Sequence, residues 1–273
     1  MLAVGRKSSL LVRALPTTER GRAALWRAFI RTKHAPSELK LAIACRRYLR
    51  DARQRYADRL ERILDGGEGK AIRRNLSLME WSELFATVFE DAAMGSASSP
   101  SIGRAMARAF RWAIREVGAA SKWSPTLSPL DQQVGELVTR VGQTTRAQVR
   151  RIVTDGLENG ATIAEIQEGL MESPAFGPSR ALMIARTETT RAVSGGTDFA
   201  LQAAAEEGII VKRQWLSARD AAVRESHREM DGQEVAVGER FVSPSGRKAT
   251  HPGGFGIPSE DINCRCTVLP VVD

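Results

Sequence analysis

Apolar side chains recur at intervals of three and four residues along much of the chain before Gly208, which is the pattern of amphipathic helices. The clearest case is residues 37–64, where the apolar positions form a stripe and most arginines fall elsewhere. That stripe consists of Leu41, Cys45, Tyr48, Ala52, Tyr56, Leu60 and Ile63. Similar patterns predict helices over residues 18–33, 77–94, 102–118, 128–157, 162–171 and 179–207.

Local signals mark several of these helix ends. Residues 121–129 are rich in proline and serine, which indicates a boundary. Ser128 followed by Pro129 is a typical helix start, because serine caps the first turn and proline needs no N–H partner there. Thr162 and Glu165 have the spacing of a capping box.

The pattern changes after Gly208. Residues 209–216 (IIVKRQWL) are strand-like, and Asp231-Gly232 is a strong turn signal. Further short strands are predicted at 234–237, 240–242 and 266–272, separated by loops rich in glycine and proline. The sequence therefore predicts an α+β protein whose mainly helical N-terminal two-thirds precede a small, loop-rich β module. The expected parts are a basic helical region (1–125), a second helical part (126–208) and the β module (209–273).

The positive charge is concentrated near the N-terminus. The chain carries a net charge of +8, but residues 1–75 hold 19 Lys and Arg against 7 Asp and Glu, or +12, and the other 21 basic and 25 acidic residues give −4. This asymmetry indicates a nucleic acid or an acidic protein as partner, and a solvated arginine-rich face is the alternative. The preferred contact surface is the arginine set of residues 37–64: Arg46, Arg47, Arg50, Arg53, Arg55, Arg59 and Arg62.

Composition excludes other classes of protein. With 42% hydrophobic and 26% charged residues, the chain is not disordered throughout. Since no window approaches 18 consecutive apolar residues, no membrane span or membrane partner is expected. The basic start of the chain lacks a cleavage signal, so no secretory leader is expected. The three cysteines form no even framework, which favours a reducing compartment and, for Cys45, a place in the core.

Two histidines and two cysteines of the β module have the chemistry of a tetrahedral zinc site. They are His227, His251, Cys264 and Cys266. Zinc prefers imidazole and thiolate ligands, and a small module with long loops would gain stability from a metal. However, Cys-x-Cys is tighter than the usual spacing of zinc ligands. The alternative is that the histidine packs against a turn and the cysteines alternate along a strand.

An ordered series of residues resembles the phage Mu protein F-like family of head-morphogenesis, or minor head, proteins. In the C-terminal segment the matching positions are Trp215, Asp220, Arg224, His227, Asp231, Gly232, Phe241, Asn263, Cys264, Arg265 and Cys266. Upstream, the family's helical Arg-Thr-Glu is matched by Arg186, Thr187 and Glu188. The resemblance covers about residues 130–273.

The shared residues are interpreted as a structural framework. Its members are Arg186, Glu188, Trp215, Arg224, Asp231, Gly232, Asn263 and Arg265. Arg186 and Glu188 stand two apart on a helix, so they point in different directions and are expected to reach the β module. Arg224 or Arg265 is expected to pair with Glu188. A catalytic or nucleotide-binding site is the alternative interpretation of these residues.

The resemblance implies a minor virion protein that enters the head through the portal vertex and acts in head assembly or in handling DNA at its exit. Its expected partners are the portal, other head proteins and, non-specifically, double-stranded DNA. Its expected locations are the virion and, during assembly, the host cytoplasm. A transferase or hydrolase site in the C-terminal module is the alternative, since the family's module is also joined to toxin domains. No enzymatic activity is expected, because no phosphate loop, nucleophile elbow or His-Glu metal helix is present. A free host nucleic-acid-binding module is a third hypothesis, but no motif supports it.

Overall fold

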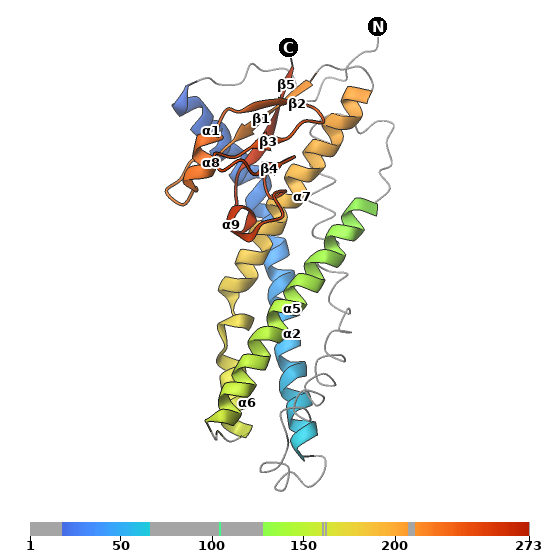
Figure 1. Cartoon of the computed structure of the whole chain (residues 1–273), viewed down its shortest axis with the longest axis vertical. Coiled ribbons are helices and arrows are strands. Elements are labelled where there is room, and N and C mark those ends of the chain that lie inside the picture. The colour runs from blue at the N-terminus through green and yellow to red at the C-terminus, as the bar shows by residue number, and fades with distance from the viewer. Residues whose placement is uncertain are drawn as a thin grey trace. The chain divides into compact units, whose positions relative to one another are not determined.

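A computed structural model describes residues 18–65, 104, 128–159, 161, 163–206 and 211–272. It confirms the α+β class: the N-terminal part is mainly helical and a small β module follows at the C-terminus (Figure 1). The helices predicted at 77–94 and 102–118 lie outside the described residues, apart from residue 104. None of the described helices is long and apolar enough to cross a membrane.

A π-helical turn lies between the first two helices. Helix α1 (Glu19–Phe29) is capped by Thr18, whose hydroxyl accepts from the Gly21 N–H. The π-helical turn Ile30–His34 follows, and helix α2 (Ala35–Asp65) continues from it. The sequence predicted two separate helices, 18–33 and 37–64. Pro36 has no N–H to donate to the preceding turn of helix. The π-helical turn directly before α2 has a wider hydrogen-bond spacing, and the helical path continues although this one donor is missing.

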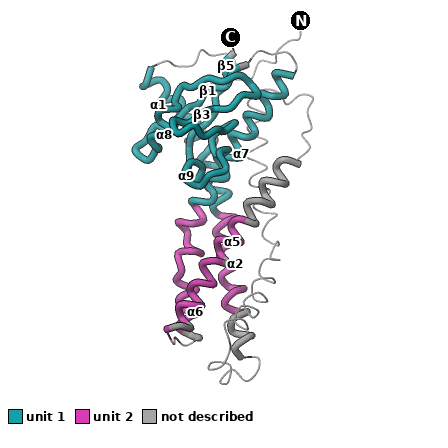
Figure 2. The backbone as a smooth tube through the Cα atoms, in the orientation of Figure 1, with its two compact units in different colours: residues 1–42, 103–131, 183–273 teal, residues 43–102, 132–182 magenta. Residues whose placement is uncertain are grey.

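Two compact units divide the chain (Figure 2). Unit 2 comprises residues 43–102 and 132–182, and contains most of α2, most of α5 (Ser128–Glu158) and α6 (Ile163–Glu172). A 3-10 turn, Pro174–Phe176, follows α6. The core of this unit includes the buried side chains of Leu49, Val149, Val153, Ile166 and Leu170. The boundaries expected at 125 and 208 stay predictions.

Unit 1 comprises residues 1–42, 103–131 and 183–273, and includes most of helix α7 (Pro178–Glu206) and the β module. Strands β1 (Val211–Leu216), β2 (Glu234–Ala236) and β5 (Thr267–Val272) form an antiparallel sheet in the order β2-β1-β5. Strands β3 (Phe241–Val242) and β4 (Lys248–Ala249) form a separate hairpin. Pro270 is tolerated because β5 is an edge strand of this sheet. Two short helices, α8 (Glu225–Glu229) and α9 (Pro258–Asp261), were not predicted.

Strand β1 docks on α7 through its inward face. Arg213 and Trp215 stand two apart, so they share that face, and both are fully buried. Arg213 pairs with Asp198 of α7 and donates to the Thr250 carbonyl at 2.9 Å. The Trp215 ring meets Phe241 edge-on, with ring centroids 5.3 Å apart. These contacts fix the sheet against the helix that carries the Arg-Thr-Glu turn.

Candidate functional site

The Arg-Thr-Glu turn of α7 holds the segment Asn263–Cys264. Arg186 Nη1 donates to Asn263 Oδ1 at 3.4 Å, and the Asn263 N–H donates to Thr187 Oγ1 at 3.0 Å. One turn later, Thr190 Oγ1 donates to the Cys264 carbonyl. Asn263 has φ = 60°, a left-handed conformation that asparagine adopts more readily than most residues. Side chains of α7 thus set the backbone just before β5.

Glu188 binds Arg191, one turn further along the same helix, and Arg191 in turn contacts the β module. Arg191 Nη1 donates to both carboxylate oxygens, at 2.6 and 2.8 Å, and Arg191 Nε donates to the Gly253 carbonyl at 2.9 Å. Gly253 has φ = 81°, and a Cβ there would lie 3.2 Å from Arg191 Cα, so the loop passes too close to α7 for a side chain. The structure gives the two expected partners of Glu188 other contacts. Arg224 donates to the Ile262 carbonyl, and Arg265 pairs with Asp220 at 2.8 Å.

Helix α1 and the π-helical turn hold the same segment from another direction. Trp26 Nε1 donates to the Arg265 carbonyl at 3.0 Å. His34 is buried, with Nε2 2.9 Å from Thr190 Oγ1 and Nδ1 3.1 Å from Glu38 Oε2. Burial opposes ionisation of Glu38, but the hydrogen bond and charge of His34, reinforced by Arg186, outweigh it and lower the pKa of this carboxyl.

The Asp231-Gly232 turn collects backbone and arginine donors. Asp231 accepts from Arg22 Nε and Nη2, both at 3.0 Å, from the Ser217 N–H at 2.8 Å and from Arg219. Burial opposes its ionisation, but these hydrogen bonds and the two guanidinium charges lower the pKa of Asp231. Gly232 has φ = 83° and donates to the Trp215 carbonyl at 2.8 Å, which closes the turn onto β1.

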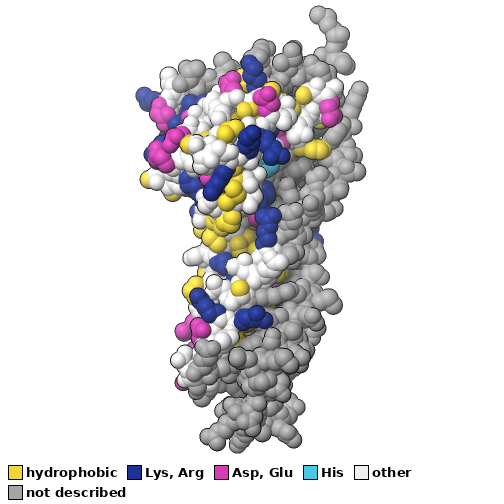
Figure 3. Space-filling view, viewed as in Figure 1, with side chains coloured by type: hydrophobic (Ala, Val, Ile, Leu, Met, Phe, Trp, Pro, Cys, Tyr) yellow, Lys and Arg dark blue, Asp and Glu magenta, His cyan; other side chains and the backbone are white. Residues whose placement is uncertain are grey.

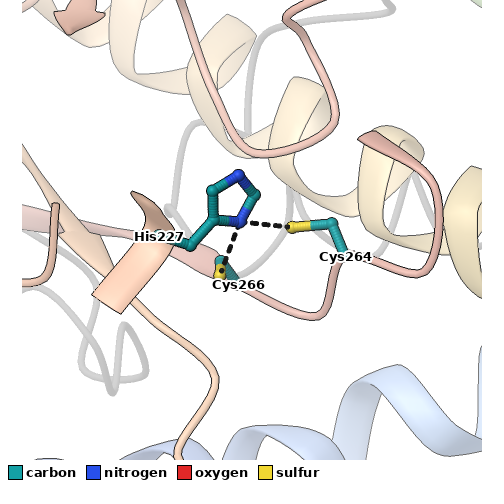
Figure 4. A group of neighbouring side chains, drawn as sticks. All are labelled: His227, Cys264 and Cys266. Atoms are coloured by element: carbon teal, nitrogen blue, oxygen red, sulfur yellow. Dashed lines mark hydrogen bonds between the residues drawn. The ribbon is translucent and has the colours of Figure 1, made fainter. Parts of the chain in front are cut away.

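Three of the four predicted zinc ligands converge (Figure 4). His227 Nδ1 lies 3.6 Å from Cys264 Sγ and 3.5 Å from Cys266 Sγ. All three residues are buried, each at most 2% exposed, and their ligand atoms lie within 4.8 Å of one another. His251 is not in this group, and its Nδ1 lies 3.0 Å from the Pro252 carbonyl oxygen instead.

The ring of His227 is packed between aromatic side chains and polar groups. Its Nε2 lies 3.2 Å from Glu260 Oε2 without a hydrogen bond, and the other ring nitrogen, Nδ1, faces the two sulfurs. The ring stacks on Phe255, with centroids 5.8 Å apart, and meets Trp215 edge-on at 5.3 Å. A histidine with a carboxylate beside one ring nitrogen can present the other as a ligand or hydrogen-bond acceptor.

The two thiols have different proton affinities. A hydrogen bond from Cys266, followed by the hydrogen bond and charge of His227, lowers the pKa of Cys264 well below its usual value, against the effect of burial. Burial and the neighbouring Cys264 raise the pKa of Cys266 well above its usual value. The pair therefore holds one thiolate more readily than two.

Comparisons with known proteins match this same part of the chain. The family model described as "Phage Mu protein F like protein" matches residues 147–269, which include α7, strands β1 and β2, the start of β5 and the His-Cys cluster. Residues 147–269 belong to the phage Mu protein F-like family. No solved structure matches the chain.

Three relatives illustrate the range of proteins that are similar to this chain. The minor head protein GP7 of Bacillus phage SPP1 is 26% identical over 144 residues, 53% of this chain and 44% of that protein. The Enterococcus faecalis "NAD(+)--arginine ADP-ribosyltransferase EFV" is 42% identical over 121 residues, 44% of this chain and 25% of that protein. The uncharacterized protein YqbB of Bacillus subtilis is 30% identical over 133 residues, 47% of this chain and 43% of that protein. The chain thus spans between a quarter and less than half of the length of these relatives.

The arginines predicted as a contact surface differ in exposure. Arg46, Arg47 and Arg50 are exposed on α2, whereas Arg53 and Arg55 are half-buried. Arg53 Nη1 donates to the Met171 carbonyl at 3.0 Å, so it also has a structural contact. The side chains of Arg59 and Arg62 lie outside the described residues. Lys and Arg side chains are visible over the described part of one face in Figure 3.

Sequence reasoning missed several residues of the Mu F-like site. Glu260, which orients His227, lies on the short helix α9, where the sequence predicted a loop. Asp261 accepts from the Phe255, Gly256 and Ile257 N–H groups and so shapes that loop. Arg213 carried a signal that went unused: it alternates with Trp215 on β1, which places a cation on the buried face. For Glu260 no comparable signal exists, because its partner is 33 positions away in sequence.

Proposed function

We propose that this chain acts as a minor head protein of a phage virion, in head morphogenesis at the portal vertex. The observation that carries the proposal is the family match over residues 147–269, which falls on a compact, internally bonded framework. The similarity to a relative named minor head protein, from Bacillus phage SPP1, supports the same assignment. Partners under this proposal are the portal and other head proteins.

The framework has the properties of a scaffold. Glu188, His227 and Asp231 are the residues that a reaction centre would use, and each already has its own set of partners. Glu188 bonds Arg191, His227 faces the cysteines and Glu260, and Asp231 binds two arginines. Buried polar side chains that are held by several partners stabilise one conformation. We infer that the Mu F-like region serves assembly rather than chemistry.

The exposed basic face of α2 is the proposed contact with a polyanion. Arg46, Arg47 and Arg50 project from one helix, and arginines on helices bind phosphates without reading base sequence. The same side chains can bind an acidic protein surface. We propose non-specific double-stranded DNA as the ligand of this face during packaging or ejection. An acidic surface of the portal is the alternative.

Co-expression with the portal protein of the same phage tests the proposal. The full chain is expected to co-purify with portal rings, and a variant with Arg46, Arg47 and Arg50 changed to Glu tests whether α2 provides the contact. The matched control changes three exposed arginines of α5 to Glu, namely Arg140, Arg150 and Arg151, so that both variants have the same net charge. Absence of the wild-type chain from both portal complexes and virions would refute the assignment.

The transferase relative favours a second candidate function, transfer of ADP-ribose. The match covers 25% of that protein, so three-quarters of it lie outside the similarity. Incubating the full chain with labelled NAD⁺ and an arginine-rich acceptor tests this candidate. We expect no incorporation of label. Incorporation that is lost in a Glu188→Gln variant would replace the scaffold proposal with an enzymatic one.

A further inference from the structure

We propose that His227 Nδ1, Cys264 Sγ and Cys266 Sγ bind one Zn²⁺ ion, which fastens α8 to the segment that leads into β5. The proposal concerns a metal site within the β module and stands independently of the role in the virion. His227 comes from α8, and the two cysteines flank Arg265 directly before β5. An ion at this point would join parts of the β module that are almost forty residues apart.

The spacing of the ligand atoms fits zinc. With Zn–S distances of about 2.3 Å, a Zn–N distance of about 2.0–2.1 Å and tetrahedral angles, the nitrogen and each sulfur should be about 3.5–3.6 Å apart. The observed Nδ1–Sγ separations are 3.5 and 3.6 Å. A hydrogen bond to sulfur also permits such distances, but it does not require both sulfurs to approach the same ring nitrogen.

The surroundings of the three residues match those of a metal site. Ligating histidines usually hold a carboxylate on the second ring nitrogen, which fixes the ring and the tautomer. Glu260 Oε2 lies 3.2 Å from Nε2, within ion-pair distance although not in hydrogen-bond geometry. Ser226 Oγ, at 3.1 Å, and Arg247, at 3.4 Å, hold Glu260 in turn. The Ala218 N–H donates to Cys266 Sγ at 3.4 Å, a contact that stabilises a thiolate.

The three side chains bring their lone pairs to one point. Two sulfur atoms and one imidazole nitrogen are buried together, and their ligand atoms lie within 4.8 Å of one another. A disulfide is not expected there, because cysteines separated by one residue close a strained ring. One Zn²⁺ ion would use all three lone pairs at once. The cysteine backbone is already fixed by α1 and α7, so little order is lost on binding.

Under this proposal the protein supplies three ligands, and a water molecule would supply the fourth. Among the described residues, the group consists of His227, Cys264 and Cys266, with no further His, Cys, Asp or Glu in it. His251, which the sequence suggested as fourth ligand, lies against Pro252. Since all three ligands are at most 2% exposed, the ion would be buried and slow to exchange.

Metal analysis of the full-length wild-type protein is the first test. Protein purified from zinc-supplemented medium without chelator should contain about one zinc per chain. After removal of zinc by a chelator, adding Co²⁺ should produce the visible d–d and near-ultraviolet thiolate-to-cobalt bands of a tetrahedral site. Wild-type protein without zinc and without these bands would overturn the proposal, and this result does not depend on whether any variant folds.

Paired variants identify the ligands. Cys264→Ser, Cys266→Ser and His227→Asn should each lose the cobalt thiolate bands or most of their intensity. The matched controls, Cys45→Ser and His251→Asn, should keep one zinc per chain. Glu260→Gln should keep the stoichiometry but bind zinc about 10–100-fold more weakly in a chelator competition. The ligand set would be refuted if His251→Asn or Cys45→Ser lost its zinc while Cys264→Ser, Cys266→Ser and His227→Asn kept theirs.

Discussion

Removing the charge of Arg213 should destabilise the β module strongly. Its side chain is fully buried, pairs with Asp198 of α7 and donates to the carbonyls of Thr250, Ala236 and Glu239. Arg213→Met keeps much of the side-chain volume but leaves the Asp198 carboxylate without its cation in a site where it is 8% exposed. Breaking a buried ion pair from one side costs about 3–5 kcal/mol. For a chain of this size, such a loss corresponds to a fall in Tm on the order of 10 °C.

Urea denaturation followed by circular dichroism and Trp fluorescence measures this loss, because Trp215 lies on the same strand face. The control is Arg240→Met, which removes an exposed arginine of the same module and should change stability by less than about 0.5 kcal/mol. Adding Asp198→Asn to Arg213→Met removes both charges and should recover part of the lost stability. The three carbonyls would still lack their donor, so recovery should be incomplete. If Arg213→Met costs less than about 1 kcal/mol, or if the two substitutions are simply additive, the pair does not dock the sheet on α7.

Three further predictions address other parts of the molecule. The pKa of Asp231 is lowered in the folded state, so its contribution to stability is present above about pH 4 and disappears as pH falls through the folded pKa. In urea titrations, the difference in unfolding free energy between wild type and Asp231→Asn should therefore narrow between pH 7 and pH 3. Asn263→Gly should be tolerated better than Asn263→Val in thermal denaturation, since a β-branched residue is strained at φ = 60°, and equal Tm values would contradict this. Changing Arg46, Arg47 and Arg50 to Glu should reduce the dependence of log Kd on log salt for duplex DNA by about 2–3, and an unchanged slope would exclude the α2 face as the DNA contact.

Local signals were sufficient for much of the helical part. The predicted start of α5 at Ser128 agrees with the structure, because serine and proline act within a single turn. The apolar stripe of residues 37–64 was also recovered at Leu41, Cys45 and Tyr56, which are buried. The continuity of α1 with α2 could not be predicted from the same kind of signal. Pro36 normally marks a helix boundary, and in the structure a π-helical turn precedes it.

In the β module, the strands could be predicted from the sequence, but the short helices and the exact set of metal ligands could not. Its strands were predicted because alternation and turn residues are local, but α8 and α9 have only five and four residues and depend on what surrounds them. Residue chemistry selected four candidate metal ligands, and the structure brings together His227, Cys264 and Cys266 while leaving His251 apart. Chemical type can nominate ligands, but it cannot distinguish two histidines of one loop-rich module.

The positions of the two cysteines follow from contacts that are not themselves part of the cluster. Thr187 and Thr190 of α7 bind the backbone on either side of the Asn263–Cys264 peptide, and Trp26 of α1 binds the Arg265 carbonyl. Three anchors on three successive residues leave the thiols little freedom, so their common direction toward His227 is a property of the framework. This explains why an Arg-Thr-Glu helix and an Asn-Cys-Arg-Cys string occur in one pattern: the first supplies the donors and acceptors that shape the second. A change in the α7 turn should therefore disturb the cluster without touching any of its three side chains.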